Sequence, residues 1–141
     1  MFRVQVKCPH ADCGKSLMDE TVLVSNAPSI HLIVRKGKEE GDLYLSSIYG
    51  DYNCIEPDLQ GFSNGDVLEF FCPHCHRPLP KLDKCSCGAH TLSMLLMDGG
   101  VIKFCSRKGC HYHNLSFENA EDLYAFLDKT RVELSDLNYK S

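Results

Sequence analysis

Four close pairs of cysteines constrain this chain more than any other feature of its sequence. Eight of the nine cysteines fall into these pairs, which are Cys8 with Cys13, Cys72 with Cys75, Cys85 with Cys87, and Cys105 with Cys110. Two thiolates held so close together can bind one metal ion, and zinc takes four sulfur or nitrogen ligands in a tetrahedron. Two pairs complete one site, so the chain carries ligands for two metal ions.

The compartment decides whether such cysteines are metal ligands or disulfides. The start of the chain, MFRVQVKCPH, alternates apolar and polar residues and lacks the apolar region of a secretory signal. Purely apolar runs reach only four residues, as in MLLM at 94–97, which is too short to span a membrane. We therefore expect a cytoplasmic, reducing environment, where paired cysteines are usually metal-binding or redox-active.

The pairs share a local pattern that sorts them into two couples. KCPHADCGKSL and FCPHCHRPL both follow a strand-like run and begin Cys-Pro-His, whereas KCSCGAHTL and FCSRKGCHYHNL form the second couple. Each pair is expected to form a tight turn, called a knuckle below, in which the backbone bends around the metal. Gly14 and Gly88 follow the second cysteine of their knuckles and can adopt the positive φ that such a turn needs.

The segment from Cys85 to Cys110 resembles the zinc-ribbon superfamily. There a knuckle leads into TLSMLLM, the turn DGG at 98–100, the run VIKF and a second knuckle, and Asp-Gly between two apolar runs is a hairpin signal. The resemblance implies a structural zinc ion at the base of a β-hairpin. The spacings C-x-C and C-x4-C depart from the C-x-x-C that is usual in the superfamily.

Two groupings of the knuckles are compatible with the sequence. In the favoured one, Cys8, Cys13, Cys72 and Cys75 bind one ion, and Cys85, Cys87, Cys105 and Cys110 bind the other. In the alternative, the two central pairs share one ion and the two outer pairs share the second. The first is favoured because it gives the hairpin at 98–100 a purpose, but cysteine spacing does not determine connectivity.

A redox role for CPHC at 72–75 is a competing interpretation. In thioredoxin-class enzymes this motif opens a helix, whereas here Pro78 and Pro80 would fall inside that helix at about 3 kcal/mol each. A knuckle is therefore favoured. Four thiolates also accept iron, so a rubredoxin-like site stays possible.

Six histidines near the knuckles could replace a ligand but are expected to be neighbours; they are His10, His74, His76, His90, His111 and His113.

The remaining segments predict a small β-rich α+β protein. Residues 1–80 are expected to form a first zinc-ribbon-like domain with a β-rich insertion at about 14–71, including a hairpin from Ile30 to Tyr49 and an irregular loop at 50–66. Residues 81–141 are expected to form a second zinc ribbon with a helix at about 117–134, on which Ala120, Leu123, Phe126, Leu127 and Leu134 can share a face. His31 is expected to be a satisfied residue within its strand. The unpaired Cys54, which has acidic neighbours, is expected to be a small buried apolar side chain.

The net charge of the chain and its motifs limit the functions that it can have. The formal charge of −4 argues against general affinity for phosphate backbones, although residues 76–113 carry six basic and two acidic groups. No catalytic arrangement is legible, and four cysteines leave zinc no open position for a substrate. We expect a non-enzymatic protein that holds two zinc ions and binds another protein. A nucleic-acid-binding ribbon that uses the basic segment 77–108 and a redox protein are the alternatives.

Overall fold

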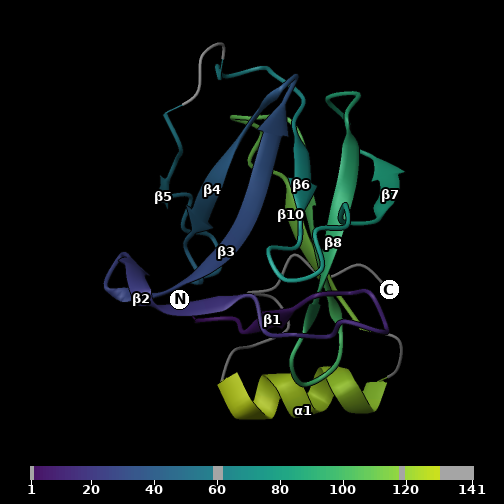
Figure 1. Cartoon of the computed structure of the whole chain (residues 1–141). Coiled ribbons are helices and arrows are strands. Elements are labelled where there is room, and N and C mark those ends of the chain that lie inside the picture. The colour runs from purple at the N-terminus through teal and green to yellow at the C-terminus, as the bar shows by residue number, and fades with distance from the viewer. Residues whose placement is uncertain (1, 59–61, 118–119, 131–141) are drawn as a thin grey trace.

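Two antiparallel sheets and one helix make up the part of the chain that the computed structural model describes, which is residues 2–58, 62–117 and 120–130. The predicted small β-rich α+β class is thereby confirmed. Figure 1 shows the helix at one end of the molecule, below the strands of both sheets. Among the described residues, no helix is long and apolar enough to cross a membrane.

The insertion forms the first sheet, with neighbours in the order β2-β3-β4-β5 and with β6 also paired to β3. Its strands are β2 (Met18–Val24), β3 (Ala27–Lys36), β4 (Glu39–Leu45), β5 (Cys54–Ile55) and β6 (Glu69–Phe71). The predicted hairpin is the β3–β4 pair, in which Ile30 lies opposite Leu45. The turn before it is Ser25–Asn26, both at positive φ, so Ala27 and Pro28 belong to the strand and not to the turn.

The second sheet contains the predicted ribbon hairpin. Its strands are β1 (Val6–Lys7), β7 (Lys81–Lys84), β8 (His90–Leu96), β9 (Val101–Cys105) and β10 (His113–Ser116). β8 and β9 pair from Thr91 opposite Cys105 to Leu95 opposite Val101, and Gly99 and Gly100 between them adopt positive φ. β5, β7 and β10 were not predicted from the sequence, because they are only two to four residues long and lack apolar alternation.

The larger hydrophobic core joins the two sheets and the helix. It contains Leu32 and Val34 from the first sheet, Met94 and Leu96 from the second, and Phe126 from the helix. In addition, β1 pairs with β8, with Val6 opposite Leu96. The division into domains at 1–80 and 81–141 stays a prediction, and the core and this strand pair both cross it.

The helix is α1 (Ala120–Thr130), which lies within the predicted 117–134. Residue 117 precedes it, and 118–119 and 131–134 are outside the described residues. Leu123 and Phe126 are buried as predicted and Leu127 is half-buried, whereas Ala120 is exposed; Leu134 lies outside the described residues. The ring of Phe126 packs at 5.5 Å from that of Phe2 and at 5.3 Å from that of Phe117. α1 therefore packs on its own chain through its apolar face.

Candidate metal centres

The eight paired cysteines gather into two groups of four. Cys8, Cys13, Cys72 and Cys75 form the first group, and Cys85, Cys87, Cys105 and Cys110 form the second. Within each group the four sulfur atoms all lie within 4.8 Å of one another. This is the grouping that the sequence favoured, and the alternative, which paired the two central knuckles, is wrong.

The spacing of the sulfurs suits a tetrahedral ion. Four sulfurs at about 2.3 Å from a central zinc ion would lie about 3.8 Å from one another. The observed separations are 3.8 Å for Cys8 and Cys75, and 3.9 Å for Cys13 and Cys72. All these cysteines are free thiols, and disulfide sulfurs would be about 2.05 Å apart. The first group therefore fits one four-coordinate metal ion.

The second group has a similar spacing but a different environment. The sulfurs of Cys85 and Cys110 are 3.7 Å apart, and those of Cys87 and Cys105 are 3.4 Å apart. Cys87 is exposed, whereas no member of the first group is. Cys85 and Cys105 form a small cluster with Ala89 that is separate from the main core, in which Cys8 and Cys72 take part. The second centre is thus the more accessible one.

All four knuckles are closed at the base by the same backbone contact, despite their unequal spacing. The amide of the first cysteine donates a hydrogen bond to a carbonyl beyond the second cysteine, over 2.7–3.2 Å; the pairs are Cys8 to Lys15, Cys72 to Arg77, Cys85 to Ala89 and Cys105 to Tyr112. C-x-C, C-x-x-C and C-x4-C therefore differ only in the length of loop above that contact. The departures from the usual spacing do not prevent the four sulfurs from converging.

The residue after the second cysteine adopts positive φ in three of the knuckles. Gly14 and Gly88 do so, at 60° and 97°, as the sequence predicted. The equivalent residue after Cys75 is His76, whose φ is 58°. Positive φ is uncommon for any residue other than glycine, so the tight turn of the knuckle determines the backbone conformation there. Sequence analysis missed His76 because it sought glycine at this position.

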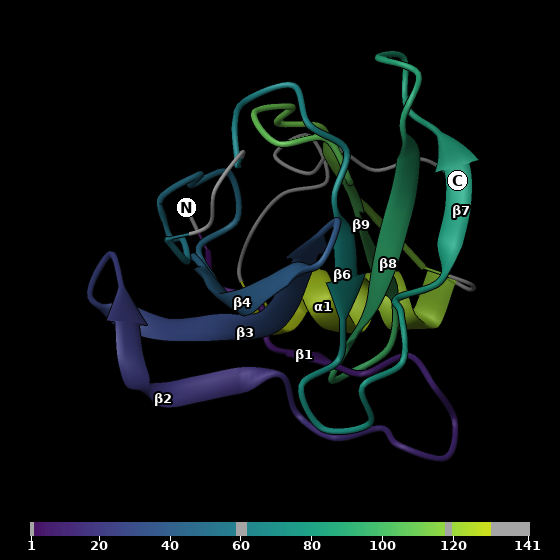
Figure 2. The same cartoon turned by 45° about the horizontal axis from the view of Figure 1, so that its top comes forward.

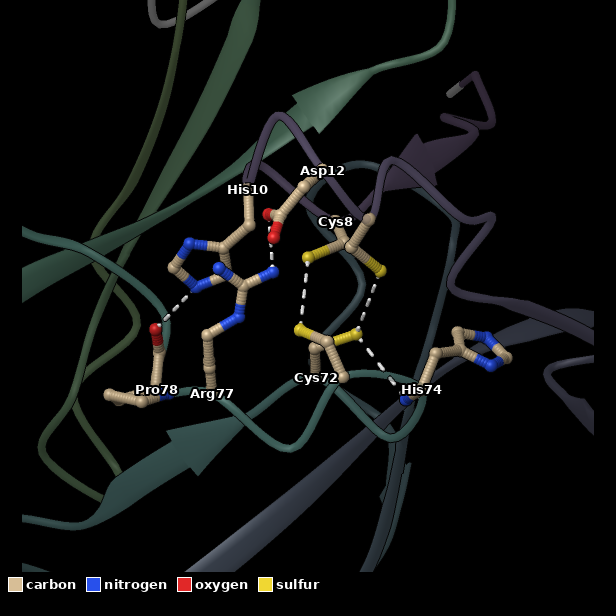
Figure 3. Close-up of polar contacts among 9 residues, drawn as sticks. Cys8, His10, Asp12, Cys72, His74, Arg77 and Pro78 are labelled. Carbon is tan, nitrogen blue, oxygen red and sulfur yellow. Dashed lines mark hydrogen bonds and ion pairs between the residues drawn. The ribbon is translucent and has the colours of Figure 1, made fainter.

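The repeated Cys-Pro-His has a structural explanation in the first group. His10 donates a hydrogen bond from Nε2 to the carbonyl oxygen of Pro78 at 2.8 Å, and His74 donates one from Nε2 to the carbonyl of Ser16 at 2.9 Å. Each histidine belongs to one knuckle and contacts the chain that leaves the other. Figure 3 shows the His10 contact beside the sulfurs. These histidines connect the two knuckles and are not metal ligands.

The other histidines also lie outside both ligand sets. Within the described residues, the two groups of potential metal ligands contain only cysteines, so none of His10, His74, His76, His90, His111 and His113 replaces a cysteine. His31 hydrogen-bonds to Asp42 at 2.8 Å and stacks on Tyr44, which confirms the expectation of a satisfied residue. Cys54, in contrast, is exposed on the edge strand β5 and is not buried as expected.

The thiols within each group differ in acidity. Burial raises the pKa of Cys8 to about 12, and burial also raises the pKa of Cys72 and Cys105. Burial also acts to raise the pKa of Cys75. Hydrogen bonds with the amide of Arg77 and with the neighbouring thiol of Cys72 outweigh this effect and lower the pKa of Cys75 to about 6. The amide of Ala89 and the guanidinium of Arg107 lower the pKa of Cys87 to about 6. If all four thiols of a group ionised, a cation among them would be needed to offset the repulsion between their charges.

An arginine lies beside the acidic thiol of each group. Contact with Asp12 and with Cys75 raises the pKa of Arg77, and contact with Cys87 raises that of Arg107. Arg77 also forms an ion pair with Asp12 at 2.5 Å, which joins the two knuckles of the first group (Figure 3). A four-thiolate zinc centre carries a net charge of −2, and these guanidinium groups offset part of it.

Comparisons of the chain with protein-family models, with curated proteins and with solved structures found no significant match. The cysteine geometry is zinc-ribbon-like, and it is this geometry that supports metal binding.

Proposed function

We propose that this chain is a non-catalytic zinc protein, in which two structural zinc ions hold a surface that binds another protein. The observation that carries the proposal is the closure of both centres by four cysteine sulfurs each. A catalytic zinc ion usually has three protein ligands and one open position for water or substrate. Four thiolates leave no such position, which favours a structural role.

The place of the first centre supports a structural role as well. Its knuckles follow β1 and β6, which belong to different sheets, so one ion there would connect the two sheets directly. Cys8 and Cys72 are fully buried within the main core. Structural zinc contributes an apparent 10–16 kcal/mol at neutral pH, roughly the whole stability of an ordinary domain. Zinc in the first centre would therefore decide whether the two sheets stay together.

The contacts of the basic segment favour a protein partner over a nucleic acid. Lys103 pairs with Asp83 at 2.8 Å, and Lys108 pairs with Glu56 at 3.0 Å. Arg107 donates a hydrogen bond to the carbonyl of Gly65 at 2.7 Å. Lys108 and Arg107 attach the last knuckle to the insertion, and Lys103 connects β9 to β7. Fewer cations therefore remain to displace counterions from a phosphate backbone. Lys81 and Lys84 are exposed on β7, too few for a basic groove.

The edge of the first sheet offers a surface for a partner. β5 pairs with β4 and ends the strand order of its sheet, and an unpaired strand edge can pair with another chain. Ile55 on β5 is 45% exposed, so its apolar side chain is available to a partner at this edge. A partner that adds a strand there would cover Ile55.

Cross-linking and affinity capture of the full-length protein from its native cell extract tests this proposal. Ile55→Glu should abolish capture of a specific partner, whereas Leu82→Glu should not, because Leu82 has the same exposure, 44%, on the strand β7 of the other sheet. Equal capture by both variants would contradict the β5 edge as the surface. A salt-sensitive shift of RNA or single-stranded DNA would favour the nucleic-acid alternative, and a red protein would indicate iron.

A further inference from the structure

A cleft of about 380 Å³ opens between the two sheets. Cys105 and Cys110 of the second group lie on its wall, but most of its lining comes from residues outside both cysteine groups. One wall comes from β4 and the segment 46–56, and the other comes from β9, the last knuckle and the start of β10. Figure 1 labels β4 and β10, and Figure 2 labels β4 and β9, in the two different sheets that supply these walls. The cleft volume lies within the range of about 300–1,000 Å³ that is typical of small-molecule sites.

The floor of the cleft is apolar and comes from both sheets. Leu43 of the first sheet and Met94 and Ile102 of the second are core residues that line it. Phe70 and Phe104 meet there edge to face, with ring centroids 5.3 Å apart. An apolar ligand that displaced water from this floor would gain hydrophobic stabilisation.

Four aromatic rings form a row at the mouth of the cleft. Tyr52 stacks on His111, with ring centroids 4.0 Å apart and 12° between the planes. His113 lies 5.5 Å from Tyr52 and 4.5 Å from Tyr49, edge to face in both cases. Tyr52 is nevertheless 51% exposed. Rings arranged in this way present faces and edges that suit another planar ring.

The charges around the cleft balance one another. The charged side chains that line it are Asp51, Glu56, Arg107 and Lys108. Lys108 pairs with Glu56, while hydrogen bonds from Ser25 and the amide of Asn53 solvate the Asp51 carboxylate. Arg107 donates hydrogen bonds to the carbonyls of Gly65 and Cys87. The two positive and two negative side chains therefore sum to zero, and each already has contacts within the protein. Burying a charged ligand against them would be costly. The cleft therefore favours an uncharged ligand.

We propose that this cleft binds an uncharged, planar aromatic molecule of roughly two rings, with the Tyr52–His111 pair as its contact at the mouth. The site goes beyond the proposed adaptor function, and it does not depend on which metal the cysteines hold. Ile55, the residue proposed for partner binding, does not line the cleft. A ligand site and a partner surface can therefore be tested separately on the same chain.

Binding of N-phenyl-1-naphthylamine, an uncharged aromatic fluorophore, to the full-length protein as purified tests the proposal. The chain contains no tryptophan, so the fluorescence of the probe is read without interference. We expect saturable binding of one probe per chain. Tyr52→Ala should weaken it about two- to tenfold, the usual contribution of an aromatic pair. Tyr124→Ala is the matched control, because Tyr124 is 65% exposed on α1 and outside the cleft.

Amide chemical shifts recorded during the titration locate the probe. The expected changes concentrate at 49–56 and 109–113, while a dispersed spectrum shows that the protein stays folded. His111→Ala provides a second variant, should Tyr52→Ala alter the fold. The proposal is overturned if the folded protein binds no probe saturably. It is equally overturned if Tyr52→Ala and His111→Ala bind as tightly as Tyr124→Ala, or if the shifts change elsewhere.

Discussion

His10 and His74 occupy the same position in their knuckles, two residues after the first cysteine, and each hydrogen-bonds to a carbonyl beyond the opposite knuckle. The two contacts connect segments 68 and 58 residues apart in the sequence. They hold the knuckles at the separation that the four sulfurs need, without taking part in coordination themselves.

Replacing either of these histidines should therefore weaken the first centre without removing it. We expect His10→Ala and His74→Ala each to lower the free energy of unfolding by about 0.5–1.5 kcal/mol, the usual contribution of one hydrogen bond. Urea denaturation of the metal-loaded protein measures this. Loss of one metal ion per chain in either variant would instead mean that the histidine is a ligand.

Substitutions at the residue after the second cysteine should change stability in opposite directions, because φ is positive there in both knuckles of the first group. Gly14→Ala should destabilise the protein by about 1–2 kcal/mol, because φ at Gly14 is 60° and an L-residue is strained there. His76→Gly should stabilise it by up to about 1 kcal/mol, because His76 already carries this strain at φ 58°. Urea midpoints compare the two variants. Destabilisation by both would show that the His76 side chain makes a contact worth more than the strain.

The two centres should differ in what their loss does to the fold. Cys72→Ser should unfold the whole protein, because Cys72 is fully buried in the core where the sheets meet. Cys87→Ser should leave that core folded and disorder only the knuckles around Ala89 and Tyr112, since Cys87 is exposed and its group forms a separate cluster. Amide exchange followed by NMR distinguishes global from local loss. Equal loss of protection in both variants would contradict this asymmetry.

A chelator should remove the metal ions in a fixed order. The second centre is expected to lose its ion first, because Cys87 is exposed and no cysteine of the first centre is. Native mass spectrometry during treatment with a chelator should therefore show a species with one ion, and amide shifts should place its vacancy among residues 85–112. Direct conversion from two ions to none, or initial loss from the first centre, would contradict the prediction.

Metal affinity should fall as the pH falls. At pH 7 in the metal-free protein, Cys75 and Cys87 are ionised, each with a pKa of about 6. Burial raises the pKa of Cys8 and Cys72 in the first group, and of Cys105 in the second. The amide of Tyr112 lowers the pKa of Cys110, but burial and the hydrogen bonds with Cys85 and Cys87 together raise it above its usual value.

These four thiols keep their protons at pH 7, and zinc must displace them because it binds thiolates. Each ion should therefore release at least two protons. Competition with a chelator from pH 6 to pH 8 should show the logarithm of the affinity rising by about two or more per pH unit. An affinity independent of pH would contradict binding through these thiols.

The metal ligands could be predicted from the sequence more completely than the arrangement of the strands could. Cys8 and Cys75 could be grouped because strand-like runs precede both knuckles, and the β8–β9 hairpin because Asp98-Gly99 separates two apolar runs. The pairing of β1 with β8 was not predictable, because it joins segments of the two expected modules and no local pattern encodes it. The cleft was not predictable either, since Tyr52 and His111 come together only when the long loop and the last knuckle fold.

Whether a residue is exposed on a sheet edge also depends on the whole fold and not on the local sequence. Cys54 was expected to be buried because a free cysteine usually behaves as a small apolar side chain, but β5 is an edge strand with its side chains outside the core. Enclosure of the sulfur by its neighbours and then the carboxylate of Glu56 still raise the pKa of Cys54. Its thiol is therefore a weak nucleophile, as its acidic sequence neighbours indicated.

The mass of the intact protein, measured under native conditions after purification without added metal, tests the central claim most directly. We predict a chain that carries two zinc ions, both lost on acidification, with all nine cysteines then reactive towards a thiol reagent. A metal-free mass that is lower by two hydrogens for each disulfide, with the same fold retained, would contradict the claim that eight thiolates close two metal centres.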